Sequence, residues 1–176
     1  MVEQLIKAFD DCFYASYNTR LINGDDEPIY SPADGDYDYH RVVFAHGYFA
    51  SGLHEVAHWS IAGEARRELV DYGYWYVPDG RNAKQQQAFE QVEVQPQAIE
   101  WMFSLAAGQP FRVSVDNLNG ESHGSAAFKQ AVYQQVLRYC QQGLPARAAI
   151  FHRALMKTFN PGYHLSADNF SLPSLR

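Results

Sequence analysis

The residues of this chain best suited to chemistry form one short pattern, His54-Glu55-Val56-Ala57-His58. Residues four apart on a helix lie on the same face, one turn apart, so the two imidazoles can reach one metal ion. In hydrolytic zinc sites with this H-E-x-x-H pattern, the glutamate activates the metal-bound water. The pattern is short, and two histidines on a buried helix can also form hydrogen bonds without a metal. It predicts a metal site with His54 and His58 as ligands and Glu55 as the catalytic candidate.

The third protein ligand is not defined by this pattern. One protease class continues with a glycine three residues after the second histidine and a ligand three further on, but here those positions hold Ile61 and Glu64. In a second class the third ligand is a glutamate from a later helix, for which the candidates are Glu90, Glu93 and Glu100. Two histidines and one carboxylate suit zinc with a bound water for hydrolysis, or ferrous iron with open positions for O₂ and substrate. Spacing alone does not choose between these metals.

The metal-binding pattern requires a helix, and the surrounding residues predict one. Ser51 can cap a helix that runs to about residue 62, after a short buried strand at 41–45. Pro96 fits the first turn of a helix at 96–107, which follows a separate Gln-rich helix. The whole pattern predicts a single helix-dominated α+β domain, residues 1–176, with a zincin-like H-E-x-x-H helix. The expected helices are 4–17, 51–62, 82–93, 96–107, 125–142 and 145–159, the expected strands are 41–45, 72–77 and 111–115, and 23–40 is expected to be a loop.

Composition limits the classes of function. Hydrophobic residues make up 47% of 176 residues, which is enough for a folded core. The formal net charge is −6 with no basic block, so we expect no nucleic-acid partner. Apolar runs are too short for a membrane span and no leader is visible, so we expect a cytoplasmic protein with no membrane partner. We also expect the protein to act as a monomer. The two cysteines, Cys12 and Cys140, fit reduced thiols in that compartment.

Several longer stretches make the chain resemble the elongation factor P hydroxylase family (EpmC/YfcM), from about residue 2 to 160. They include His54-Glu55 with His58-Trp59, and Val92-Glu93-Val94 with Pro96-Gln97-Ala98. The other matching stretches are Thr19-Arg20-Leu21-Ile22, Gly24-Asp25-Asp26-Glu27-Pro28-Ile29-Tyr30, Ile61-Ala62-Gly63, Ala65-Arg66-Arg67-Glu68-Leu69-Val70-Asp71, Gly73-Tyr74-Trp75-Tyr76, Pro78-Asp79-Gly80-Arg81 and Asp116-Asn117-Leu118.

The resemblance implies a monooxygenase that uses Fe(II), with zinc or another divalent metal as alternatives, and O₂ as cosubstrate. It implies hydroxylation of one β-lysylated lysine side chain of translation elongation factor P. Carried over, the metal ligands are His54, His58 and Glu93, with Glu100 as the fallback carboxylate. Glu55 could then orient a ligand rather than activate water, since ligating histidines usually donate their other N–H to an acceptor.

Two further functions stay open from the residues themselves. One is an H-E-x-x-H zinc hydrolase of the peptidase type, and the other is a metal-stabilised binding domain without turnover. The acidic stretch at 25–38 is either a solvated surface loop or, if the substrate is a lysine with a further amine, a source of electrostatic attraction.

Overall fold

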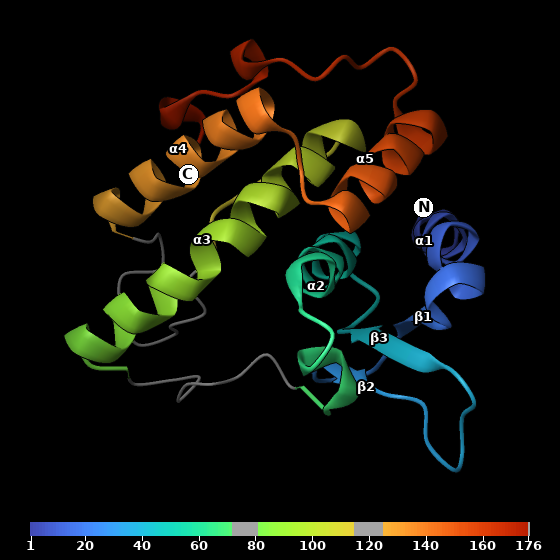
Figure 1. Ribbon diagram of the computed structural model, residues 1–176. Coiled ribbons are helices and arrows are strands. Elements are labelled where there is room, and N and C mark those ends of the chain that lie inside the picture. The colour runs from blue at the N-terminus through green and yellow to red at the C-terminus, as the bar shows by residue number, and fades with distance from the viewer. Residues whose placement is uncertain (72–80, 115–124, 176) are drawn as a thin grey trace.

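The computed structural model describes residues 1–71, 81–114 and 125–175, and over these residues it is a helix-dominated α+β fold, as predicted (Figure 1). The predicted strand at 72–77 and the family-like stretch at 116–118 lie outside the described residues. The elements are α1 (Val2–Tyr17), β1 (Thr19–Asn23), β2 (Ile29–Ser31), β3 (His40–Phe44), α2 (Phe49–Ile61), α3 (Ala83–Ala106), α4 (Ala126–Gln142) and α5 (Ala146–Phe159), with 3₁₀ turns at Arg66–Glu68, Ala167–Asn169 and Leu172–Ser174.

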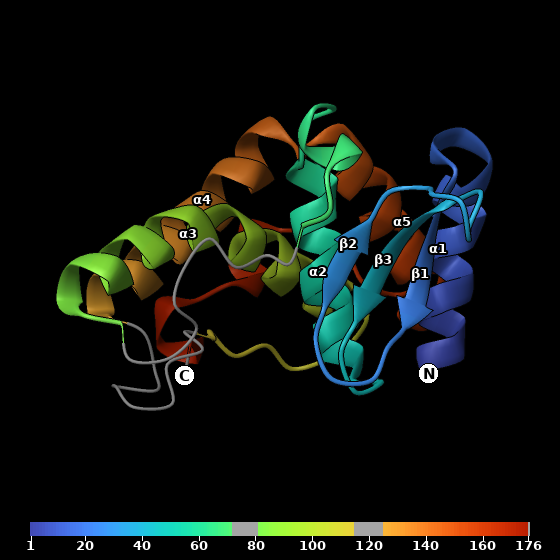
Figure 2. The same cartoon turned by 90° about the horizontal axis from the view of Figure 1, so that it is seen from below.

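The small sheet lies beside the helices and has the strand order β1-β3-β2. β3 pairs parallel with β1 and antiparallel with β2. α1 packs on β1 and α2 packs on β3, so both helices lie behind the sheet in Figure 2. The chain then runs from the end of β3 through a short turn into α2, which carries the two histidines.

The helix pattern explains why α2 has a fixed position. Its buried residues include Leu53, Val56, Ala57 and Trp59, which form one apolar face and leave the histidines on another. The Trp59 ring lies 5.2 Å from the ring of Phe9 and 4.8 Å from that of Phe13, both from α1. Such edge-to-face aromatic contacts restrain rotation of the helix about its axis.

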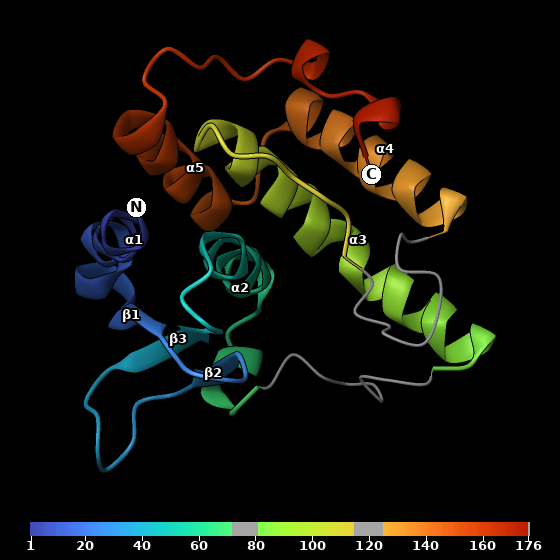
Figure 3. The same cartoon turned by 180° about the vertical axis from the view of Figure 1, so that it is seen from behind.

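Helix α3 corrects the prediction of two helices at 82–93 and 96–107, because it is continuous with Pro96 inside it. Proline removes one helical hydrogen bond, here the bond to the carbonyl of Val92. Val92 is 51% exposed, so water can bond to that carbonyl instead. The helix also has a full capping box at Asn82 and Gln85, and it packs against α2, α4 and α5, as Figures 1 and 3 show. These contacts outweigh the local preference of proline for a helix start.

Other boundaries differ from the predictions for local reasons. Ser51 is not the cap of α2: the helix begins at Phe49, and the Ser51 hydroxyl accepts a hydrogen bond from the backbone N–H of Ala45. The expected loop at 23–40 contains the three-residue strand β2, and β1 was not predicted. Residues 111–114 form no strand. Strands this short depend on pairing with a distant segment, which local sequence does not reveal.

Within the described ranges, the helices include none with both the length and the apolar character needed to cross a bilayer.

Candidate metal centre

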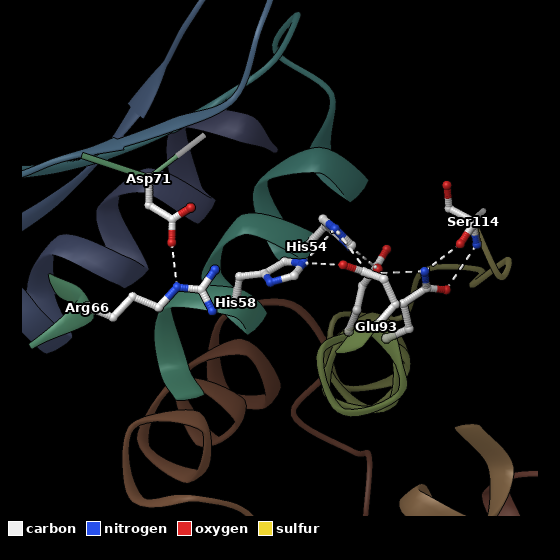
Figure 4. A network of polar contacts seen from close by, with 8 residues as sticks. His54, His58, Arg66, Asp71, Glu93 and Ser114 are labelled. Atoms are coloured by element: carbon white, nitrogen blue, oxygen red, sulfur yellow. Dashed lines mark hydrogen bonds and ion pairs between the residues drawn. The ribbon is translucent and has the colours of Figure 1, made fainter. Parts of the chain in front are cut away.

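Two neighbouring turns of α2 place the histidine rings side by side. The Nε2 atoms of His54 and His58 lie 3.1 Å apart, and the ring centroids are 4.6 Å apart. Both side chains are only partly exposed, at 22% and 23%. Figure 4 shows both rings directed from α2 toward α3. The spacing of four residues therefore produces the convergence that the sequence predicted.

Helix α3 brings Glu93 to the same point. Its Oε1 lies 3.1 Å from Nε2 of His58, and its Oε2 lies 3.8 Å from Nε2 of His54. Glu93 is buried, with 4% of its surface exposed. One ligating atom from each of the three residues lies within 4.8 Å of the others. The three predicted ligands are thus assembled from two helices that are far apart in sequence.

Glu100 has a different position from Glu93. Its Oε2 lies 2.8 Å from Nδ1 of His54, on the side of the ring away from Nε2. A carboxylate there accepts the Nδ1–H bond, which leaves the Nε2 lone pair free to bind a metal. Glu100, and not Glu55, therefore has the position at Nδ1 of His54 that an acceptor orienting this ring requires.

The remaining carboxylate candidates lie elsewhere. Glu90 accepts hydrogen bonds from the backbone and hydroxyl of Ser125 at the start of α4. Glu64 is exposed, just after the end of α2. The four candidate acids are Glu64, Glu90, Glu93 and Glu100. Of these, only Glu93 has carboxylate oxygens close to the Nε2 atoms of both His54 and His58.

The charges of the site are strongly coupled. Burial raises the pKa of Glu93, but the two histidines, His58 foremost, lower it further, and the net pKa is about 2. Burial lowers the pKa of His54, but the nearby carboxylates, Glu100 first, raise it well above its usual value. Glu93 is therefore ionised at any physiological pH, which is the form that binds a cation.

The donor set fits a divalent transition metal. Metal–nitrogen bonds of about 2.0–2.1 Å at angles between 90° and tetrahedral place donor atoms about 3 Å apart. The 3.1 Å separations of His54 from His58 and of His58 from Glu93 match that geometry. Two imidazoles and a carboxylate serve both catalytic zinc and non-haem iron.

Gln97, which sequence reasoning missed, supports Glu93. Its Nε2 donates to Glu93 Oε2 at 3.3 Å, and its amide also pairs with both backbone groups of Ser114. Gln97 is 1% exposed. Its position one helical turn after Glu93 was a usable signal, because a buried amide that close to a carboxylate usually bonds to it.

Glu55 lies between two cavities. The larger is an open groove lined by His54, Glu55 and Glu100. Its other lining residues come from the start of α2 and from three loops: Ala50 and Ser51 of α2, and Asp26, Pro28, Ala45, Pro110, Phe111, Arg112 and Ser114. The smaller cavity lies on the His58 side and includes Glu55, Arg66, Arg67 and Asp71. Figure 4 shows Arg66 and Asp71 beyond His58, on the side away from Glu93.

The Glu55 carboxylate has no hydrogen bond or ion pair within residues 1–71, 81–114 and 125–175. Burial raises its pKa, the two histidines lower it, and Glu93 and Glu100 raise it, with a net increase. Its side chain is half-buried. It is thus an available acid beside the three-residue cluster.

The acidic stretch at 25–38 divides into two parts. Asp26 lines the groove beside the cluster, as an attractive role for a cationic substrate would require. Asp34 instead accepts bonds from the backbone of Asp36 and Tyr37 and pairs with Arg41, so it stabilises its own turn.

Two comparisons with known proteins identify the family of this chain. The family model of elongation factor P hydroxylase matches residues 8–170. A Haemophilus influenzae protein named elongation factor P lysine hydroxylase is 50% identical over 171 residues, which cover 97% of this chain and 96% of that protein. The residues matched by the family model span both α2 and α3. On the extent of these matches, the chain belongs to the elongation factor P hydroxylase family.

Proposed function

We propose that this protein is a non-haem Fe(II)-dependent monooxygenase that hydroxylates the β-lysylated lysine side chain of elongation factor P, with O₂ as cosubstrate. The observation that carries the proposal is the cluster of His54, His58 and Glu93 in a chain 50% identical to a lysine hydroxylase. Two histidines and one carboxylate leave open positions for O₂ and a substrate, as oxygenase chemistry needs.

Each residue of the site has a role in this proposal. His54, His58 and Glu93 would hold the iron, which when bound supplies O₂ activation. Glu100 holds the His54 ring by its Nδ1–H, and Gln97 holds Glu93 in a buried position. The open groove admits a long side chain from a partner protein to the cluster, while the buried face of α2 limits access of water from behind.

The zinc peptidase is the second candidate, and Glu55 is the observation that favours it. An available glutamate between two metal-binding histidines is the arrangement of a water-activating base. A peptidase would hydrolyse peptide substrates with zinc and lose nearly all of that activity in Glu55→Gln. The hydroxylase would show no peptidase activity in either form.

Mass spectrometry of the partner tests the proposal directly. Purified, iron-loaded protein is incubated in air with a two-electron reductant and β-lysylated elongation factor P, and the modified peptide should gain the mass of one oxygen while the second oxygen atom leaves as water. His54→Ala, His58→Ala and Glu93→Ala should each abolish the gain, whereas Glu64→Gln should not. No gain with iron-loaded protein and a suitable reductant would refute the function.

We also propose that residues 1–176 act as one domain, as a monomer in the cytoplasm. Size-exclusion chromatography with light scattering should give a mass near 20.0 kDa.

A further inference from the structure

The two cavities that meet at Glu55 differ in the balance of their charges. The groove contains the carboxylates of Asp26, Glu55 and Glu100, opposed by Arg112. The smaller pocket contains Arg66 and Arg67, opposed by Asp71 and by the same Glu55. A cationic ligand is therefore attracted to the groove, where carboxylates outnumber arginines, more strongly than to the smaller pocket, which gives the site a direction of entry.

Within the groove, only some of the acids are available to a ligand. Glu100 is committed to Nδ1 of His54. Glu55 is half-buried, and none of the described residues pairs with its carboxylate. A partly desolvated carboxylate without a partner is costly, and an incoming ammonium group would offset that cost by a charge-assisted hydrogen bond. Asp26 is exposed, so it marks the solvent end of the same groove.

The rest of the groove suits the carbon chain of such a ligand. Pro110 and Phe111 are among its lining residues. The Phe111 ring is stacked on Trp101 of α3, with centroids 5.6 Å apart and planes 15° apart, so its position is held by a buried residue. A methylene chain can lie against this apolar wall while its amines reach the acids.

We propose that Glu55 is a substrate-binding residue that pairs with an ammonium group of the β-lysyl unit, with Asp26 receiving its second ammonium group at the outer end of the groove. This rests on the proposed function, since it concerns the substrate of that reaction. A β-lysyl unit has two amines, and the unmodified lysine has one, so two carboxylates along the groove select the modified partner.

A binding measurement without turnover distinguishes a role of Glu55 in substrate binding from a role in the reaction. The iron-loaded full chain is titrated anaerobically with β-lysylated and with unmodified elongation factor P. Glu55→Gln should raise the Kd of the β-lysylated form roughly tenfold or more, and leave the Kd of the unmodified form within about twofold. Asp26→Asn should raise the first Kd by a smaller factor, about threefold, that shrinks as salt is added. Hexane-1,6-diamine should compete with the β-lysylated partner in the wild type and much less in Glu55→Gln.

Matched variants serve as controls. Glu64→Gln and Asp36→Asn each remove one carboxylate outside the groove and should leave both Kd values unchanged. Glu55→Asp retains the charge and should recover part of the binding, which also controls for misfolding. Iron content should equal that of the wild type in every variant.

The outcomes distinguish this proposal from the function on which it rests. If the wild type hydroxylates the partner but Glu55→Gln binds the β-lysylated form as tightly as the wild type, the proposal is wrong and Glu55 acts in the reaction or in the fold. If Glu55→Gln loses its iron, Glu55 belongs to the metal site and the proposal is again overturned. If the wild type adds no oxygen to either partner, the proposed function itself fails.

Discussion

At the scale of single residues, one imidazole contacts two carboxylates with different roles. His54 Nε2 lies 3.8 Å from Glu93, and its Nδ1 lies 2.8 Å from Glu100. The two glutamates are seven residues apart, or about two turns of α3, and therefore share a face of that helix. The His54 ring therefore reaches one carboxylate of this face with each of its two nitrogens.

Removing the orienting carboxylate should weaken the metal site without removing a ligand. Glu100→Ala is expected to lower metal affinity about 10–100-fold, because the His54 ring and tautomer are no longer held. Metal titration of the purified protein against a competing chelator measures the effect. Glu100→Gln keeps an acceptor for Nδ1–H and should lose less, and equal affinities for all three proteins would show that packing alone orients the ring.

At the scale of elements, α3 connects the metal centre to a wall of the groove. Gln97 bonds to Glu93 on its own helix and to the backbone of Ser114 in the segment after it. The site and the groove are therefore coupled through one buried amide.

Replacing the Gln97 amide by an apolar group should lower both the stability of the fold and the affinity for metal. Gln97→Leu leaves backbone groups of Ser114 and the Glu93 carboxylate without this partner, which we expect to cost about 1–3 kcal/mol of unfolding free energy. Denaturant unfolding measures it, with a parallel fall in metal affinity. Gln95→Leu, at an exposed position of the same helix, should change neither quantity; a similar loss in both variants would contradict the role of Gln97.

A second link joins α3 to α4. The Ser125 hydroxyl accepts from the N–H of Phe128 as the helix cap and donates to Glu90 of α3. Ser125→Ala should lower stability by about 1 kcal/mol, the usual effect of losing such a cap. Ser125→Thr retains the hydroxyl and should restore most of the thermal midpoint; if it behaves like the alanine variant, the cap is not the cause.

At the scale of the whole molecule, buried aromatic residues join the helices around α2. Phe151 of α5 lies 5.8 Å from Phe9 of α1 and 5.1 Å from Phe103 of α3, measured between ring centroids. His152 follows in the same helix and is 4% exposed. Burial, and then Arg153, lower the pKa of His152 to about 4.

This buried histidine predicts how stability depends on pH. The unfolded chain binds a proton near pH 6.5, and the folded chain only near pH 4, so stability is lost as the pH falls through that interval. The loss attributable to His152 is about 3 kcal/mol between those limits. The measurement is the unfolding free energy at pH 7 and at pH 4. The difference between these two values should be smaller in His152→Leu than in the wild type, and unchanged in His164→Leu, an exposed control. A pH dependence unchanged by His152→Leu would contradict the assignment.

Features that depend on residues close together in the chain were predictable before the fold was known. The convergence of His54 and His58 follows from four-residue spacing on a helix, and α1, α4 and α5 follow from apolar periodicity and end signals. The family resemblance, confirmed by the comparisons, added Glu93 as the expected third ligand.

Features that depend on contacts between distant segments became visible only in the folded chain. The positions of Glu93 and Glu100 on opposite nitrogens of His54 depend on how α3 crosses α2. β1 and β2 exist through pairing with β3, and Pro96 is tolerated because α3 packs on three other helices. Residue spacing encodes geometry within one helix, but the distance between two helices is determined by the packing of the whole core, which local patterns do not specify.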